Sequence, residues 1–237
     1  MQADLFFQTR TWIILKPFPP FAQEDGPGFG LKDSKKLEAE TPVRTVAMIT
    51  EGNMMSYEVE LKFAVTDVPQ LLEKLEQFGL CFGEAVEEHD TFYQHPAKDY
   101  AATDECLRIR YRAGEYRITY KGPKVDRETK TRQEIELFLA DNAKTARQWD
   151  QLLQALGFRV AAELKKMRRT AGLVYQEQKY ELSLDHIDGL GDFIELETIA
   201  NAMQLDDARC RILSLAETLE LTQPITASYL ELSQAEK

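Results

Sequence analysis

The sequence contains few cysteines and no long apolar run. Cys81, Cys106 and Cys210 are the three cysteines among 237 residues, and none of them belongs to a CxxC pair. Cysteines in this number and spacing predict neither a disulfide framework nor a zinc site. No apolar stretch approaches the ~18 residues that a membrane-spanning helix needs, and the segment from Met1 to Pro20 lacks the order of a secretory signal. These absences predict a cytoplasmic protein with no membrane partner.

Acidic residues outnumber basic residues. The chain has 29 Lys and Arg against 40 Asp and Glu, and its formal net charge is −11. A broad nucleic-acid interface must neutralise many phosphates at once, so we expect no nucleic-acid partner, although a local basic pocket remains compatible with this balance. Hydrophobic residues make up 43% of the chain, which is enough for one ordinary core.

The first 54 residues differ from the rest of the chain. Prolines and glycines crowd between Pro17 and Gly30, and a charged stretch without periodicity follows. Such a segment is not expected to pack. Strong alternation begins only after Met54 and Met55. We therefore expect residues 1–54 to be a disordered extension, or an upstream stretch included by a wrong start codon, and residues 55–237 to form the folded domain.

From Tyr57 onward the dominant period is two. Tyr57, Val59, Leu61 and Phe63 share one strand face and leave the opposite face to charged residues, and similar alternation recurs within 107–112, 116–121, 134–139, 180–185 and 194–197. Three stretches have helical spacing instead. They begin at Asp67, at Asp141 or Asn142, and near Asp206, and the first two stop at glycines.

The charged strand faces allow two interpretations. An antiparallel sheet with its charged face in water is an ordinary arrangement. However, like charges at i and i+2 repel, so strands that carry clusters of one sign need partners or a ligand. If about eight strands curl into a closed or nearly closed antiparallel β-barrel, with helices covering its apolar outside, the charges line a tunnel. We predict this α+β fold.

The two signs of charge together suggest a ligand. Paired carboxylates are ligands for hard divalent cations such as Mg²⁺ or Mn²⁺, whereas Arg and Lys offer charge-assisted hydrogen bonds to phosphate oxygens. Because buried charges are costly unless they pair or bind ions, a tunnel lined by both signs indicates a site for a metal-bound polyphosphate.

These residues resemble the CYTH superfamily of triphosphate tunnel metalloenzymes. The resemblance rests on an ExExK motif, Glu58-Val-Glu60-Leu-Lys62, and covers about Tyr57 to Tyr229. Supporting motifs in family order are Leu107-Arg108-Ile-Arg110, Tyr120-Lys121-Gly-Pro, Arg132-Gln-Glu134-Ile-Glu136, Lys166-Met-Arg168-Arg169, Leu184-Asp185 and Glu195-Leu-Glu197. The Tyr-Lys-Gly-Pro stretch, the segment 95–108 and the closing segment 228–232 are most similar to class IV adenylyl cyclases.

The resemblance implies conversion of ATP to cyclic AMP and pyrophosphate with two divalent ions, Mg²⁺ or Mn²⁺. The implied metal ligands are Glu58, Glu60, Glu134, Glu136, Glu195 and Glu197, with Glu60 and Glu195 foremost. The implied triphosphate-binding residues are Lys62, Arg108, Arg110, Lys121, Lys166 and Arg168, and the implied catalytic residues are Glu58, Lys62 and Asp185. Asp185 would orient a basic residue or assist proton removal. Lys166 and Arg168 are chosen over their neighbours by strand parity.

Other functions share the same tunnel. A hydrolase would direct water at the terminal phosphorus of inorganic, thiamine or nucleoside triphosphate, and a non-catalytic protein would simply bind polyphosphate. The run from Lys124 to Arg132 is typical of a solvated loop. The barrel edges and the third helix are compatible with a homodimer.

Overall fold

The computed structural model of the protein describes residues 12–15, 56–126 and 128–235. The strands are β1 (Trp12–Leu15), β2 (Ser56–Val65), β3 (Val86–Gln94), β4 (Cys106–Arg112), β5 (Glu115–Lys121), β6 (Arg132–Ala140), β7 (Arg159–Tyr175), β8 (Gln178–Ile187) and β9 (Gly191–Asn201). The helices are α1 (Val68–Gln77), α2 (Tyr100–Thr103), α3 (Ala143–Ala155), α4 (Leu205–Thr218) and α5 (Tyr229–Ala235).

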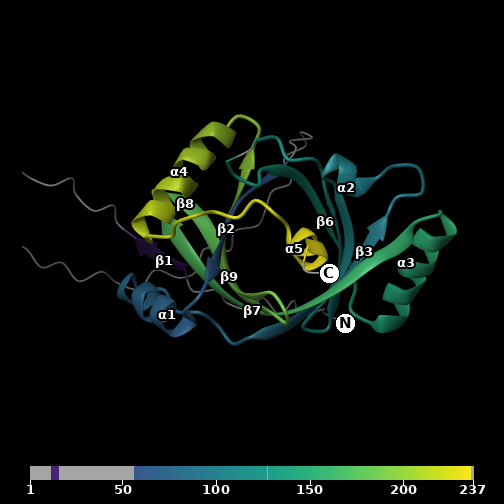
Figure 1. The fold of residues 1–237 in the computed structure, drawn as a ribbon, viewed down its shortest axis with the longest axis horizontal. Coiled ribbons are helices and arrows are strands. Elements are labelled where there is room, and N and C mark those ends of the chain that lie inside the picture. Colours follow the sequence, from purple (N-terminus) through teal and green to yellow (C-terminus); the bar gives the residue numbers. More distant parts are fainter. Residues whose placement is uncertain (1–11, 16–55, 127, 236–237) are drawn as a thin grey trace, which may run out of the picture.

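Strands β2 to β9 form a closed barrel of eight antiparallel strands (Figure 1). The order around the barrel is β7-β3-β4-β5-β6-β2-β9-β8, and a pairing between β7 and β8 closes the ring. The 17-residue strand β7 pairs with two strands: its first part pairs with β3 and a later part pairs with β8. The predicted fold is confirmed.

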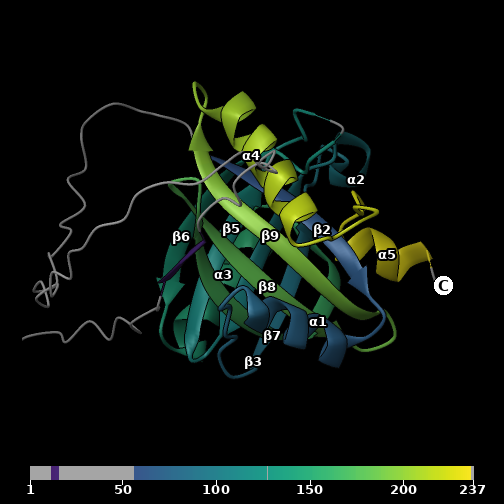
Figure 2. The ribbon, with the colours of Figure 1, turned by 90° about the vertical axis from the view of Figure 1, so that its left-hand side faces the viewer.

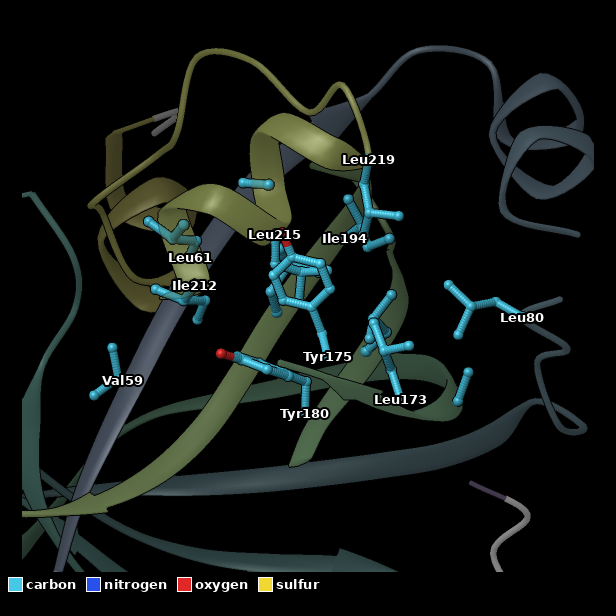
Figure 3. Close-up of a cluster of buried hydrophobic side chains, with 14 of the residues drawn as sticks. Val59, Leu61, Leu80, Leu173, Tyr175, Tyr180, Ile194, Ile212, Leu215 and Leu219 are labelled. Carbon is cyan, nitrogen blue, oxygen red and sulfur yellow. The ribbon is translucent and has the colours of Figure 1, made fainter. Parts of the chain in front are cut away.

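Helices cover the outside of the barrel on two sides, with α1 and α4 on one side and α3 on the other (Figure 1), and Figure 2 faces the side of α1 and α4. On one side, Ile212 and Leu215 of α4 lie in a cluster with Val59 and Leu61 of β2, which Figure 3 shows in close-up. On the other side, Leu153 of α3 lies in a second cluster with apolar residues of β3 to β6. The apolar strand faces therefore point outward to the helices, and the charged faces point inward.

The three predicted helices are present. The Asp67 side chain accepts a hydrogen bond from the backbone N–H of Gln70 at 2.9 Å and caps α1. Asn142, rather than Asp141, caps α3 by accepting from the backbone N–H of Thr145 at 2.9 Å. The short helices α2 and α5 were not predicted, since each is too brief to show a helical period.

Within residues 1–54, the structure describes one strand. Trp12–Leu15 forms β1, which pairs in parallel with Gly172–Tyr175 of β7. The remainder of this segment lies outside the described residues, so its interpretation as a disordered or mis-started extension stays a prediction. In the described part of the chain, no helix is long and apolar enough to cross a membrane.

Candidate functional site

The barrel contains a cavity of about 1720 Å³ lined by charged side chains. Among the residues predicted from the sequence, those that line it are Glu58, Glu60, Arg108, Arg110, Lys121, Glu134, Glu136, Lys166, Arg168, Glu195 and Glu197. Lys62 and Asp185 are fully buried and are not among the lining residues, but each contacts one: Lys62 contacts Tyr229, and Asp185 contacts Lys166. The structure thus brings strands from the whole length of the domain to one cavity.

Strand register aligns the charges of β2 with those of β9. Glu60 lies opposite Glu197, and Lys62 lies opposite Glu195. On the far side of β9, Glu197 lies opposite Glu181 of β8. Because directly opposite like charges repel, this row of three carboxylates across β2, β9 and β8 favours a nearby cation.

A cation-rich cluster occupies the wall formed by β3, β4 and β7. The Arg110 guanidinium donates two hydrogen bonds to Asp90, each 2.7 Å long, and lies 3.1 Å from Glu88. Lys166 lies 3.4 Å from Glu88. Burial alone would raise the pKa of Glu88, but Arg168, Lys166 and Arg110 outweigh it and lower that pKa to about 2. The cations are therefore neutralised by internal carboxylates.

Asp185 is the centre of a second group of contacts. It accepts hydrogen bonds from Arg168 at 2.6 and 2.5 Å, from Lys166 at 3.0 Å and from the Tyr229 hydroxyl at 2.9 Å. Burial raises the pKa of this carboxyl, but Arg168 and Lys166 lower the pKa by more, so it lies below its ordinary value. A carboxylate held this way is a poor proton acceptor. Its geometry favours a positioning role over proton removal.

Lys62 is surrounded differently. Its Nζ atom is buried, has no hydrogen-bond partner in the described residues, and lies 4.1 Å from the centroid of the Tyr229 ring. Burial lowers the pKa of Lys62, with a contribution from nearby Lys130, to about 8. Burial therefore favours the neutral form of this amine more than water does.

Carboxylates gather on the wall formed by β2, β6 and β9. Glu60 accepts from Lys130 Nζ at 2.6 Å, and Glu58 contacts Lys121. Burial raises the pKa of Glu197 well above its ordinary value, and Glu58 and Glu134 raise it further. A divalent cation at this wall would relieve the repulsion, so the donor set fits Mg²⁺ or Mn²⁺ in chemistry.

The carboxylates do not form a complete metal cage. In the described residues, no group of three or more His, Cys, Asp or Glu side chains is arranged to hold a metal ion. Mg²⁺ in phosphate-transfer sites commonly uses one or two carboxylates and takes its other ligands from substrate phosphates and water. The arrangement is consistent with that mode, in which substrate completes the coordination.

Of the two predicted ligands on β6, Glu136 lies apart from the other carboxylates. Glu136 is partly exposed and pairs with Arg117 at 3.3 Å and with the Thr119 hydroxyl at 3.1 Å. Glu134 lies 3.4 Å from Lys121. Glu134 therefore joins the carboxylate wall through Lys121, whereas Glu136 lies at a more exposed position and contacts Arg117 and Thr119.

The sequence interpretation missed Glu88 and Asp90. Both point inward from β3 and are buried, but the opposite face of that strand carries Glu87, His89 and Thr91. With polar residues on both faces, no hydrophobic alternation marks the segment as a strand. Tyr93, which has the opposite parity and packs in the outer cluster with Leu107 and Ile109, is the signal that could have identified the inward face.

The interpretation of 124–132 as a solvated loop is wrong for its second half. Thr129, Lys130, Thr131 and Arg132 are buried. The backbone N–H of Lys130 donates to the carbonyl of Glu60 at 3.0 Å, which continues the short pairing between β2 and β6 and brings the Lys130 side chain into the cavity. The sequence analysis also missed Tyr229 as a site residue, although this tyrosine belongs to the closing segment 228–232.

The arrangement of strands and cavity agrees with comparisons to known proteins. The model of the CYTH domain family matches residues 56–227. The chain belongs to the CYTH domain family. CYTH proteins bind triphosphate substrates and typically use divalent metal ions.

Two curated CYTH relatives carry adenylate cyclase names. "Putative adenylate cyclase MJ0240" of Methanocaldococcus jannaschii is 34% identical over 178 residues, which cover 74% of this chain and 97% of the relative. "Adenylate cyclase CyaB" of Aeromonas hydrophila is 28% identical over 184 residues, covering 75% of this chain and 89% of the relative.

Solved structures show the same fold. The PH1819 protein of Pyrococcus horikoshii OT3 has a TM-score of 0.65 and 32% identity, and the match covers 76% of this chain and 99% of that one. A Hippeastrum protein, HpAC1, has a TM-score of 0.55 at 17% identity, with coverage of 77% and 97%, and this likeness concerns the fold alone.

Proposed function

We propose that this CYTH protein converts ATP to cyclic AMP and pyrophosphate. The observation that carries the proposal is the juxtaposition, inside one closed barrel, of the Arg and Lys cluster on β4 and β7 with the carboxylates of β2 and β9. Such a cavity supplies phosphate-binding cations and hard metal ligands together. The names of the two curated relatives support the cyclase among the reactions that this cavity can serve.

The cation cluster would hold the triphosphate. Arg108, Arg110, Lys166 and Arg168 now pair with Glu88, Asp90, Asp185 and Glu195. Each guanidinium carries five N–H donors in a planar fork, so it can bind phosphate oxygens while it keeps a carboxylate partner. The carboxylates would hold the cations in position, and phosphate would occupy the remaining donors.

Cyclisation requires an in-line displacement at the α-phosphorus. The ribose 3′-oxygen bonds to this phosphorus, the bond to the bridging oxygen breaks, and pyrophosphate leaves with the electron pair of that bond. The proton of the 3′-hydroxyl goes to a base. Lys62 is our choice, because its Nζ has no hydrogen-bond partner in the described residues and lies beside the ring of Tyr229, which lines the cavity, whereas Asp185 is engaged by cations.

Glu60, Glu195 and Glu197, with Glu58 beside them, would hold Mg²⁺ or Mn²⁺, and a bound divalent ion screens phosphate charge and acidifies an attacking hydroxyl. Arg168 contacts Glu195 at 2.5 Å. Lys121 would serve the same end of the site, where it now contacts Glu58. These assignments make β2 and β9 the metal wall and β4 and β7 the phosphate wall.

Triphosphate hydrolysis is the second candidate. The structure of HpAC1, which shares the fold, is described as revealing a dominant triphosphatase activity in that protein. The same cations would hold inorganic or organic triphosphate while water attacks the terminal phosphorus. Nothing in the cation cluster itself favours a ribose hydroxyl over water.

Product analysis decides between the candidates. Purified protein is incubated with ATP, and separately with inorganic triphosphate, in the presence of Mg²⁺ or Mn²⁺, and products are separated by chromatography. We expect cyclic AMP and pyrophosphate in equal amounts from ATP. Orthophosphate in place of these products would show that the protein is a hydrolase and not a cyclase. Retained binding without turnover would identify a polyphosphate-binding protein. An Arg168→Ala variant controls for contaminating enzymes.

A further inference from the structure

Lys130 is a cavity-lining cation outside the set of residues proposed to hold the triphosphate. It is buried, and its ammonium donates a hydrogen bond to Glu60 Oε1 at 2.6 Å. The backbone N–H of the same residue donates to the carbonyl of Glu60 at 3.0 Å. Lys130 is therefore joined to Glu60 twice, once through the main chain and once through its charge.

A network of hydrogen bonds fixes the segment that carries Lys130. The Asp126 carboxylate accepts from the backbone N–H of Thr129 at 2.7 Å and from its hydroxyl at 2.8 Å. The hydroxyls of Thr129 and Thr131, both buried, lie 2.6 Å apart. The backbone N–H of Val125 donates to the carbonyl of Thr131 at 2.8 Å. With both neighbours held in this way, the main chain at Lys130 has little freedom to move away from Glu60.

An arginine of α4 joins this network from outside the barrel. Arg209 Nε lies 3.1 Å from Asp126 Oδ2 and donates to the Thr131 hydroxyl at 3.4 Å. Helix α4 itself packs through its apolar face against β2 and β9 (Figure 2). The helix that covers the strand of Glu60 thus also anchors the segment of Lys130. We call the contacts among Arg209, Asp126 and Thr131 the Arg209 anchor.

The proposed metal ligand Glu60 is already paired with an ammonium. A divalent ion at Glu60 and the Lys130 ammonium need the same carboxylate, and like charges at contact distance repel strongly where water is scarce. Lys130 neutralises Glu60 in the metal-free protein, as Lys121 does for Glu58. A divalent ion must therefore overcome this pairing, whereas phosphates bound nearby would add negative charge that favours both cations.

We infer that Lys130, held by the Arg209 anchor, competes with the divalent cation for Glu60 and keeps metal binding weak until the triphosphate is present. The inference deepens the proposed function and rests on its assignment of Glu60 as a metal ligand. It makes Lys130 a counter-cation of the metal wall, and Arg209 and Asp126 positioning residues that act through it. The divalent ion would accordingly enter together with the phosphates.

Equilibrium binding of Mn²⁺ to nucleotide-free protein, measured by calorimetry, tests this inference without turnover. Lys130→Met removes the charge and keeps an unbranched side chain, and it should bind Mn²⁺ about tenfold more tightly than the unchanged protein. Arg209→Ala should tighten binding about twofold to threefold, because the ammonium is held less firmly. Arg209→Lys, which keeps a charge beside Asp126, should restore the unchanged affinity.

Two matched controls should leave the Mn²⁺ affinity unchanged. Lys74→Met removes a lysine of α1 that pairs with Glu220. Arg211→Ala removes a second arginine of α4, which pairs with Asp207 at 2.9 Å.

Glu60→Gln supplies the background that identifies the shared carboxylate. In that background Lys130→Met should lose most of its effect, because the group for which the two cations compete is gone. Unchanged or weaker Mn²⁺ binding in Lys130→Met, or an equal gain with and without Glu60, would overturn the inference. If Lys130→Met fails to fold, Arg209→Ala compared with Arg211→Ala decides, and equal affinities in these two variants would reject the competition.

Assays of cyclic AMP separate this inference from the proposed function. Tighter Mn²⁺ binding in Lys130→Met, with no cyclic AMP from the unchanged protein, would reject the cyclase and keep the competition for Glu60. Cyclic AMP formation by the unchanged protein, with no gain of Mn²⁺ affinity in Lys130→Met, would keep the cyclase and reject the competition.

Discussion

The hydroxyl of Tyr229 donates a hydrogen bond to Asp185 at 2.9 Å, across 44 residues of sequence. The same tyrosine ring lies 4.1 Å from Lys62 Nζ. A residue of the last helix thereby links two predicted catalytic residues that lie on β2 and β8. The backbone N–H of Ile225 donates to the carbonyl of Lys62 at 2.7 Å, which fixes the segment before α5 on β2.

Separate substitutions distinguish the two contacts of Tyr229. Tyr229→Phe removes the hydrogen bond to Asp185 and keeps the ring over Lys62, so we expect kcat/KM for ATP to fall about threefold to tenfold. Tyr229→Ala removes both contacts and should cost about tenfold more. Steady-state kinetics across pH 6 to 10 provide the measurement. Equal rates for the two variants would mean that the ring over Lys62 is without influence.

Arg168 and Arg169 form a matched pair for the phosphate site. Arg168 contacts Asp185 and Glu195 in the cavity, whereas Arg169 points away and donates to the carbonyl of Gly83 at 2.9 Å. Arg168→Ala should lower kcat/KM about a hundredfold, because charge-assisted hydrogen bonds to phosphate are lost. Arg169→Ala should stay within a few fold. Comparable losses in both variants would remove Arg168 from the phosphate site.

Substitutions of Glu60 test the proposed metal-binding role of the carboxylates on β2 and β9. Glu60→Ala should abolish turnover and leave the fold intact, since it relieves repulsion by Glu197 as much as it disturbs the contact with Lys130. Glu60→Gln keeps the side-chain shape and should raise the Mg²⁺ concentration needed for half-maximal rate by about tenfold. Circular dichroism verifies folding. Glu87→Gln, an exposed change on β3, serves as the control, and an undiminished rate in Glu60→Ala would exclude Glu60 from the site.

Glu88 should make stability depend on pH in acid. Its pKa is lowered from 4.5 to about 2 in the folded protein. A depressed carboxyl pKa stabilises the folded state above the unfolded value, and this contribution disappears as pH falls from about 4.5 toward 2. At ~1.4 kcal/mol for each pKa unit, the contribution is on the order of 3–4 kcal/mol.

Urea unfolding of ligand-free protein between pH 2 and 7 measures this contribution. Glu88→Gln should be less stable than the unchanged protein at pH 7 and should lose less stability on acidification. Glu87→Gln, whose side chain lies on the outer face of the same strand, should reproduce the unchanged slope. If Glu88→Gln shows the unchanged slope as well, its pairing with Arg110 and Lys166 does not influence folding.

Much of the site could be predicted from local pattern. Alternation in 57–63 indicated that Glu58, Glu60 and Lys62 share a face, and parity separated Arg168 from Arg169. The structure has the side chains in these directions, because side-chain direction in a strand follows from spacing alone, and their roles stay predictions. The interpretation failed where local pattern was absent, at Glu88 and Asp90, whose strand is polar on both faces, and at Lys130, whose burial results from backbone pairing with β2.

The sequence by itself determined that period-two strands carry charges on one face and apolar residues on the other, because strand geometry is local. It could not determine which charges meet. The opposition of Glu60 to Glu197, the pairing of Lys166 and Arg168 with Asp185, and the Tyr229 ring over Lys62 depend on barrel closure and strand register. Closure and register are set by long-range interactions. These are the packing of the apolar strand faces against α1, α3 and α4 and the pairing of the charges inside the barrel.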